Sequence, residues 1–241
     1  MTGNHGPAEL KKKVLACVDL MKDPERLLQG CAKYLEAEKR DCVYVVALEY
    51  AERHERSPKS ILFAAQTLLL AWNTPLYCKK MYRMQNVGRD LKSVYDLNDR
   101  VLMDLKSKKL GELIPEDLAK VRELFRSFGQ CDSIYWTGAS KALHVANPAL
   151  FVMWDNDIRT AYHLLHDSHD ESTCYEEFSK ASNDIAKVLI SKKTETELSL
   201  HHPAFESTGV KRTVAKMMDE YNYAVIKPIG KLIKAELQQD S

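Results

Sequence analysis

The sequence predicts an all-α protein. Apolar residues recur at helical spacing along most of the chain, proline or helix-capping residues precede many of these stretches, and no segment alternates like a β-strand. We expect about ten helices from this periodicity. The 241 residues can form a single unit, 1–241, of two interlocked helical subdomains that share a core.

Start signals mark the helices expected in the first part of the chain. These helices are expected at residues 9–21, 24–34, 41–53, 58–72 and 76–84. Asp23 followed by Pro24 is typical of an N-cap and a first helical position. Ser57 precedes the most apolar stretch, 58–72, and a helix that is apolar on every side is expected to be buried on every side.

Further helices are expected at residues 91–104, 115–128, 175–190, 209–223 and 229–237. Gly129 is expected to end one of them in a left-handed conformation, and Pro228 to separate the last two. Residues 199–203 are expected to be a linker. The polar stretch 166–171 holds two histidines among acids, but their spacing fits no common metal site, and we expect a solvated loop.

The stretch 134–162 contains the residues of greatest chemical interest. Trp136-Thr137-Gly138 is expected to form a turn, and Ala139–Ala146 a short helix that stops at Asn147-Pro148. The apolar run Leu150–Trp154 then leads to Asp155 at the start of another helix. Asp155 can cap that helix, or it can be a carboxylate at the mouth of a cleft.

This stretch resembles the helix-hairpin-helix DNA glycosylases, the endonuclease III-like superfamily. The residues Gly138–Ala142 match the second half of the family's Gly-x-Gly-x-x-x-Ala hairpin, and Met153–Arg159 matches the segment with the catalytic aspartate. The resemblance implies a hairpin at 134–146, a catalytic segment at 150–162 and a cleft between the subdomains. The chain departs from the family pattern at Trp136, which replaces the first hairpin glycine.

The resemblance implies that Asp155 is the catalytic carboxylate of an N-glycosidic bond cleavage. A carboxylate there stabilises positive charge on the sugar or activates water. Ser140 occupies the position of the lysine found in family members with lyase activity. A monofunctional enzyme that attacks with water is therefore expected, although Lys141 is the next residue and leaves an amine route open.

The resemblance also implies contacts with double-stranded DNA. The backbone N–H groups near Gly138, with Ser140 and Lys141, are expected to hold a phosphate, and Trp72 or Asn73 to fill the hole that the extruded base leaves. The base pocket is expected to contain Gln66, Trp136 and Trp154. Each of these side chains can equally be part of the protein core. Asp155 can equally serve only as the N-cap of its helix.

Composition limits the other possibilities. The net charge of +1 gives no bulk basic field, so DNA binding would depend on local basic clusters. Three such clusters are recognisable: Lys79-Lys80-Arg83, Lys106-Lys108-Lys109 and Lys211-Arg212-Lys216. Six cysteines without a C-x-x-C pair predict no metal and no cofactor, only free thiols in a reducing compartment. No signal peptide or membrane-spanning run is recognisable, so we expect a cytoplasmic monomer without a membrane partner.

Two other functions remain open at this point. One is a nucleoside or nucleotide N-glycoside hydrolase on the same scaffold, which the weak basicity favours. The other is a non-catalytic all-α module that binds DNA or a protein through the hairpin. Replacement of Asp155 separates the two enzymes from the binding module, because only an enzyme needs the carboxylate.

Overall fold

The computed structural model of the protein describes residues 6–165 and 170–239, and every regular element in them is helical. The all-α prediction is confirmed. The elements are α1 (Pro7–Leu20), α2 (Pro24–Ala37), α3 (Asp41–Arg53), α4 (Pro58–Trp72), α5 (Thr74–Lys79), α6 (Met81–Leu97), α7 (Asp99–Asp104), α8 (Pro115–Gly129), α9 (Tyr135–Ala146), α10 (Asn156–His163), α11 (Glu171–Lys192), α12 (Glu195–Leu200), α13 (Pro203–Thr208), α14 (Val214–Tyr221), the π-helix η1 (Asn222–Ile226) and α15 (Lys227–Gln239).

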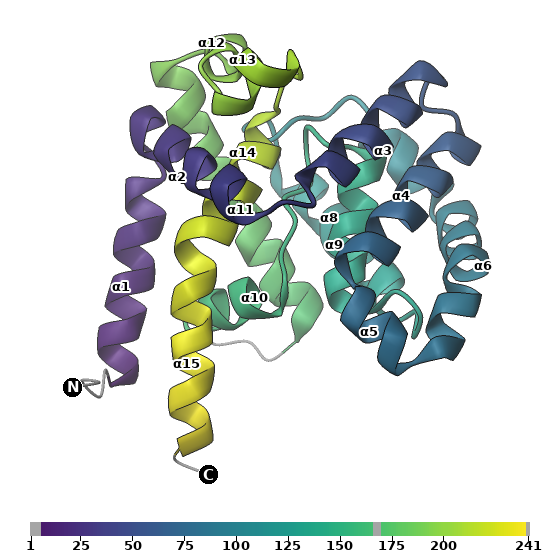
Figure 1. The fold of residues 1–241 in the computed structure, drawn as a ribbon, viewed down its shortest axis with the longest axis horizontal. Helices are drawn as coiled ribbons and strands as arrows, with labels where there is room; N and C mark the ends of the chain where they lie inside the picture. Colours follow the sequence, from purple (N-terminus) through teal and green to yellow (C-terminus); the bar gives the residue numbers. More distant parts are fainter. Residues whose placement is uncertain (1–5, 166–169, 240–241) are drawn as a thin grey trace.

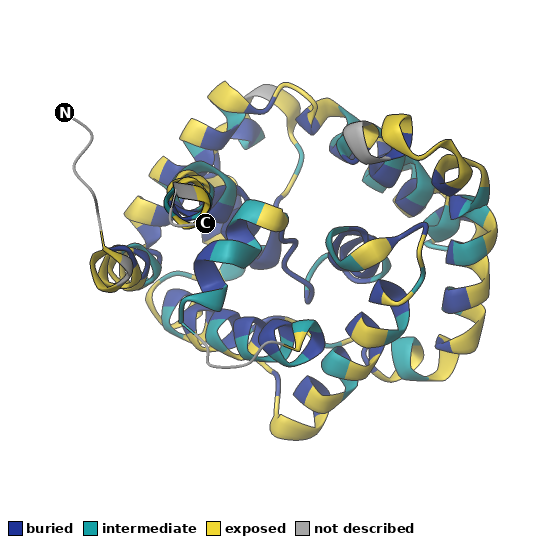
Figure 2. Ribbon diagram, turned by 90° about the horizontal axis from the view of Figure 1, so that it is seen from below, coloured by how far each residue is buried: buried dark blue, intermediate teal, exposed yellow. Residues whose placement is uncertain are grey.

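The helices gather in two groups (Figure 1). Helices α3 to α9, blue and teal, form one group, and α1 and α2 join α10 to α15 in the other. The ends of the chain meet in the second group, where α1 packs on α15 and α2 packs on α14 and η1. The chain thus leaves the second group after α2 and returns to it at α10. Buried residues face inward between the helices, and exposed residues cover the outside (Figure 2).

Several predicted helix starts are confirmed in atomic detail. The Asp23 side chain accepts the backbone N–H groups of Glu25 and Arg26 at the start of α2. The Ser57 hydroxyl accepts the N–H of Ser60 at the start of α4. Each cap satisfies N–H groups that the first helical turn cannot pair internally. Local chemistry therefore determines where these helices begin.

The predicted turn at Trp136–Gly138 was wrong, because these three residues already belong to α9. That helix begins at Tyr135, four residues before the predicted Ala139. The turn lies earlier, where the N–H groups of Ile134 and Tyr135 both bind the carbonyl of Cys131, at 3.0 and 2.8 Å. Tyr135 has a φ of 60°, a left-handed conformation that lets the chain enter α9 sharply.

The predicted left-handed end at Gly129 was also wrong, since the described glycines with positive φ are Gly111 and Gly209. Gly129 is instead required by packing. A Cβ at Gly129 would lie 1.9 Å from Cε3 of Trp136, so only glycine leaves room for the indole ring.

Other boundaries differ from the prediction as well. The expected helix 91–104 is divided at Asn98 into α6 and α7, and the expected linker 199–203 contains the end of α12. Instead of a break at Pro228, the chain continues from α14 through η1 into α15. Helix α4 is not buried on every side, because Phe63 is 52% exposed. The predicted loop 166–171 lies mostly outside the described residues.

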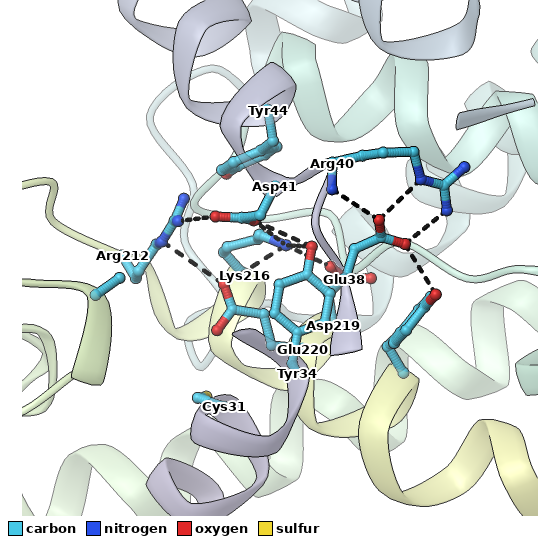
Figure 3. Close-up of polar contacts among 12 residues, drawn as sticks. Cys31, Tyr34, Glu38, Arg40, Asp41, Tyr44, Arg212, Lys216, Asp219 and Glu220 are labelled. Carbon is cyan, nitrogen blue, oxygen red and sulfur yellow. Dashed lines mark hydrogen bonds and ion pairs between the residues drawn. The ribbon is translucent and has the colours of Figure 1, made fainter. Parts of the chain in front are cut away.

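A buried ionic network fixes α14 against α2 and the start of α3 (Figure 3). The fully buried Lys216 ammonium lies 2.9 Å from an Asp219 oxygen, 3.5 Å from Glu220 and 3.7 Å from Asp41. The ring of Tyr34 packs against the same ammonium, 4.4 Å from Nζ to the ring centroid. Burial opposes the charge, but Asp219, the nearest carboxylate, and its neighbours raise the pKa of Lys216 well above its usual value.

His144 joins α9 to two other parts of the fold. Its Nε2 lies 2.9 Å from the Tyr44 hydroxyl on α3, and its Nδ1 lies 2.6 Å from the Phe151 carbonyl. Complete burial lowers the pKa of His144 to about 3. Both ring nitrogens are thus used by a neutral imidazole.

The neutral His144 predicts a specific loss of stability in acid. Because its pKa is depressed in the folded state, its contribution is present above the unfolded pKa of about 6.5 and is lost as the pH falls toward 3. In this range the free energy of unfolding falls by up to about 1.4 kcal/mol per pH unit. Urea denaturation at pH values from 7 to 4 should show a smaller slope for His144→Asn than for the unaltered protein. Equal slopes would contradict this assignment.

Candidate functional site

A cavity of about 480 Å³ lies between the two helix groups, within the size range of small-molecule sites. Side chains from the end of α2, the end of α4, α9, the start of α10, and α14 to α15 border it. The lining residues are Tyr34, Glu38, Arg40, Trp72, Asn73, Tyr135, Thr137, Lys141, Met153, Trp154, Asp155, Asn156, Asp157, Ile158, Arg159, Asp219, Tyr223 and Lys227.

Asp155 has a double role at the edge of this cavity. As the N-cap of α10, its Oδ1 accepts the N–H groups of Asp157 and Ile158 at 2.9 and 3.0 Å. Its Oδ2 lies 2.5 Å from Nζ of Lys227 on α15. Burial alone would raise the pKa of Asp155, but the Lys227 ammonium and the Ile158 N–H hold it below its usual value. The capping role is confirmed, and the carboxylate also faces the cavity.

Lys141 enters the same cavity from α9. Its ammonium donates a hydrogen bond to Oδ1 of Asn73 and lies 6.0 Å from the centroid of the Trp72 ring. Burial lowers the pKa of Lys141 to about 8, although Asp155 and Asp219 attract its charge and oppose the shift. The amine is therefore much closer to its neutral form at physiological pH than an exposed lysine is.

Ser140 and Gly138 lie inside the protein, away from the cavity lining. The Ser140 hydroxyl donates to the Trp154 carbonyl at 3.1 Å and accepts the Trp154 N–H at 3.2 Å, which ties α9 to the segment before Asp155. Gly138 is buried against Ile134. We correct the predicted phosphate contacts on this basis, because neither residue reaches the surface.

The aromatic and amide candidates divide between the cavity and the core. Trp72, Asn73 and Trp154 all line the cavity, and Asn73 is held there by Lys141 instead of projecting outward. Gln66 lies against Gly88 of α6 and is absent from the lining. Trp136 stacks on Phe125, with ring centroids 5.5 Å apart, and is also absent from the lining. The pocket roles predicted for Gln66 and Trp136 are therefore corrected to packing roles.

Six lining residues come from the two ends of the chain and were not predicted. They are Tyr34, Glu38, Arg40, Asp219, Tyr223 and Lys227. Arg40 binds both carboxylate oxygens of Glu38 at 2.8 and 2.6 Å, and the Tyr223 hydroxyl donates to Glu38 at 2.8 Å. Although burial opposes the shift, these contacts lower the pKa of Glu38 to about 2. Glu38 thus joins α2 to η1 at the cavity wall.

The π-helix aligns three of the lining residues. Asp219, Tyr223 and Lys227 are spaced by four residues, and in an α-helix each such step rotates about 40° beyond a full turn. The wider turn of η1, between Asp219 and Lys227, counteracts that rotation. All three side chains consequently face one cavity, and Lys227 Nζ lies 3.8 Å from the centroid of the Tyr223 ring. The four-residue spacing was the only sequence signal for this group.

Cys31, His202 and Glu220 form a buried group whose ligand atoms lie within 4.8 Å of one another. Its hydrogen bonds argue against a metal. The Ala204 N–H donates to His202 Nδ1 at 3.1 Å, so the ring proton is on Nε2, 2.6 Å from a Glu220 oxygen. A metal on Nε2 would require that proton to move to Nδ1, where it would meet the Ala204 N–H. We assign this group to the buried polar network.

The chain matches no protein-family model, no curated protein and no solved structure. Within residues 6–165 and 170–239, no helix has the length and apolar character needed to cross a membrane. Function is therefore inferred from the cavity and its chemistry.

We predict that Gly230→Ala displaces α15 from α10. A Cβ at Gly230 would lie 1.9 Å from the carbonyl oxygen of Asp157, and a backbone oxygen cannot turn aside. The substitution should cost about 1–3 kcal/mol in urea denaturation and should raise the pKa of Asp155, measured by carboxyl NMR, as Lys227 moves away. Gly6→Ala is the control, because no atom of residues 6–165 and 170–239 lies within 4 Å of the new Cβ. Equal stability of the two variants would refute the prediction.

Proposed function

We propose that this protein is a DNA glycosylase that cleaves the N-glycosidic bond of a damaged or modified base flipped out of duplex DNA. The observation that carries the proposal is the pairing of an amine of lowered pKa, Lys141, with the carboxylate of Asp155 in one cavity. Of the resemblance to helix-hairpin-helix glycosylases, the segment Met153–Arg159 supports the proposal, whereas the expected hairpin residues Gly138 and Ser140 are buried in α9.

The lining of the cavity suits a planar, aromatic substrate. Its aromatic side chains are Tyr34, Trp72, Tyr135, Trp154 and Tyr223. Enzymes that act on a base in DNA extrude it into such a pocket and stack it between aromatic groups. Tyr135 is 42% exposed at this cavity and is the lining aromatic most accessible to DNA.

The chemistry we propose begins with the neutral amine of Lys141. The amine attacks C1′ of the deoxyribose, the C1′–base bond breaks, and the base leaves with a proton. The Asp155 carboxylate stabilises the positive charge that develops on the sugar. The nitrogen gives up both of its protons in this sequence: one leaves with the base, and the other passes to O4′ as the C1′–O4′ bond breaks, which opens the sugar ring and leaves an imine between Lys141 and C1′. Water attack assisted by Asp155 was the route predicted from Ser140, and trapping of the imine distinguishes the two.

The predicted basic clusters differ in how many of their cations are exposed to a DNA backbone. Lys79 and Lys80 are exposed at the end of α5, whereas Arg83 of the same cluster is buried and paired with Asp132 at 2.6 Å. Lys216, from another cluster, belongs to the buried network. Arg212 is buried as well, and the exposed cations that remain in the three clusters predict salt-sensitive duplex binding. They are Lys79, Lys80, Lys106, Lys109 and Lys211.

The first test is a panel of duplexes carrying uracil, 8-oxoguanine, alkylated bases and hypermodified cytosines, treated with alkali to reveal abasic sites. We expect cleavage of at least one duplex and a loss of at least about 100-fold in Asp155→Asn, as for removal of one electrostatic stabiliser. Lys12→Gln, an exposed substitution on α1 outside the cavity lining and the basic clusters, is the control. DNA binding without cleavage would leave a binding module, and turnover of free nucleosides alone would indicate a nucleoside hydrolase.

The Lys141 mechanism makes a separate prediction about pH. Because the neutral amine is the nucleophile and the pKa of Lys141 is lowered to about 8, trapping by borohydride should increase from pH 6 and level off above pH 8–9. Lys141→Gln should abolish the trapped complex. Base release that persists in Lys141→Gln without any trapped complex would establish water attack and a monofunctional enzyme.

A further inference from the structure

Asp219 is a carboxylate in the cavity wall that the proposed bond cleavage does not use. It lies on α14, is only 6% exposed and lines the cavity together with Lys141 and Asp155. Its Oδ2 accepts a hydrogen bond from Lys216 Nζ at 2.9 Å, which fixes the orientation of the carboxylate. Lys216 is itself held by Asp41 and Glu220. Asp219 is therefore a rigid acceptor in the cavity wall.

The other lining carboxylates already have specific partners. Both oxygens of Glu38 are bound by Arg40. Asp155 caps α10 and pairs with Lys227, and Asp157 binds Lys234 on α15 at 2.5 Å. A carboxylate has about four acceptor sites, and the contact with Lys216 uses one of those on Asp219. Asp157 and Asp219 therefore keep the most acceptor sites, and Asp219 is the more deeply buried of the two, with 9% of its side chain exposed against 20% for Asp157.

The shape of a carboxylate selects among bases by their hydrogen-bonding edges. Its two oxygens accept two parallel N–H groups, as they do from the guanidinium of arginine. Guanine presents such a pair in N1–H and the 2-amino group. Adenine and cytosine place an acceptor beside their amino group, and uracil and hypoxanthine have a single N–H on that edge. A base with the wrong edge would leave the buried carboxylate facing an acceptor or a gap.

We propose that Asp219 is the specificity-determining residue of this site and that the substrate is a guanine-type base modified away from its N1–H and 2-amino edge. The inference rests on the proposed function, because it takes the cavity to hold a nucleobase. The modification then lies at positions such as N7 or C8. Lys216 acts as a positioning residue that keeps Asp219 aimed at the base.

The test uses binding and does not depend on catalysis. The probes are 9-methylguanine, 9-methylhypoxanthine and 9-methyladenine, titrated into the full-length protein by calorimetry. We expect 9-methylguanine to bind at least about tenfold more tightly than 9-methylhypoxanthine, which lacks only the 2-amino group, because a hydrogen bond to a charged group is lost. Asp219→Asn should abolish that ratio, and the lining control Asp157→Asn should retain it.

The outcomes separate this inference from the proposed function. Equal binding of the three probes by a protein that cleaves DNA would overturn the role of Asp219 and leave the glycosylase intact. A guanine preference that disappears in Asp219→Asn, in a protein that cleaves no duplex, would support the role of Asp219 and overturn the glycosylase. If Asp219→Asn does not fold, the affinities of the unaltered protein for the three probes are the test. Equal affinities would then overturn the proposed guanine specificity.

Discussion

A buried ammonium organises the deep part of this molecule. Lys216 of α14 is completely buried, and three carboxylates, those of Asp41, Asp219 and Glu220, lie within 4 Å of it. Removing one member of such a network leaves an uncompensated charge in the interior, which typically costs about 3–5 kcal/mol. The network therefore holds α2, α3 and α14 in one arrangement, and the wall of the cavity that contains Tyr34 and Asp219 depends on it.

The sequence was most informative where short-range chemistry decides the structure. Asp155 was identified from an apolar run followed by a capping residue, and both features depend only on neighbours within a few positions. Lys141 and Ser140 show the limit of such reasoning. The two residues are neighbours on α9, but only Lys141 faces the cavity. The hydrogen bonds of Ser140 to Trp154 fix this orientation. Those bonds depend on tertiary packing.

The remaining part of the site depends on contacts between distant parts of the chain. Tyr34 and Lys216 are 182 residues apart in the sequence, and their contact joins the early helix α2 to the late helix α14. No local pattern predicts such a pairing. The π-helix adds a second difficulty, because the alignment of Asp219, Tyr223 and Lys227 requires a departure from regular helical periodicity that the spacing alone does not reveal. Gln66 and Trp136 were wrongly assigned for a related reason: their aromatic or amide chemistry is equally suited to packing.

The cavity wall combines α2, from the early part of the chain, with α14 and α15, from the late part, and this affects the order in which the protein can fold. During synthesis on the ribosome, α9 and Asp155 emerge well before α14 and α15. A nascent chain at that stage holds Lys141 and Asp155 but lacks the residues that complete the cavity, Asp219 and Lys227. Helix α2 is made long before α14, so the face that packs on α14 remains uncovered until that helix has been made. The cavity is therefore completed only after α14 and α15 have been made, and the Lys141 amine acquires its buried environment at that stage.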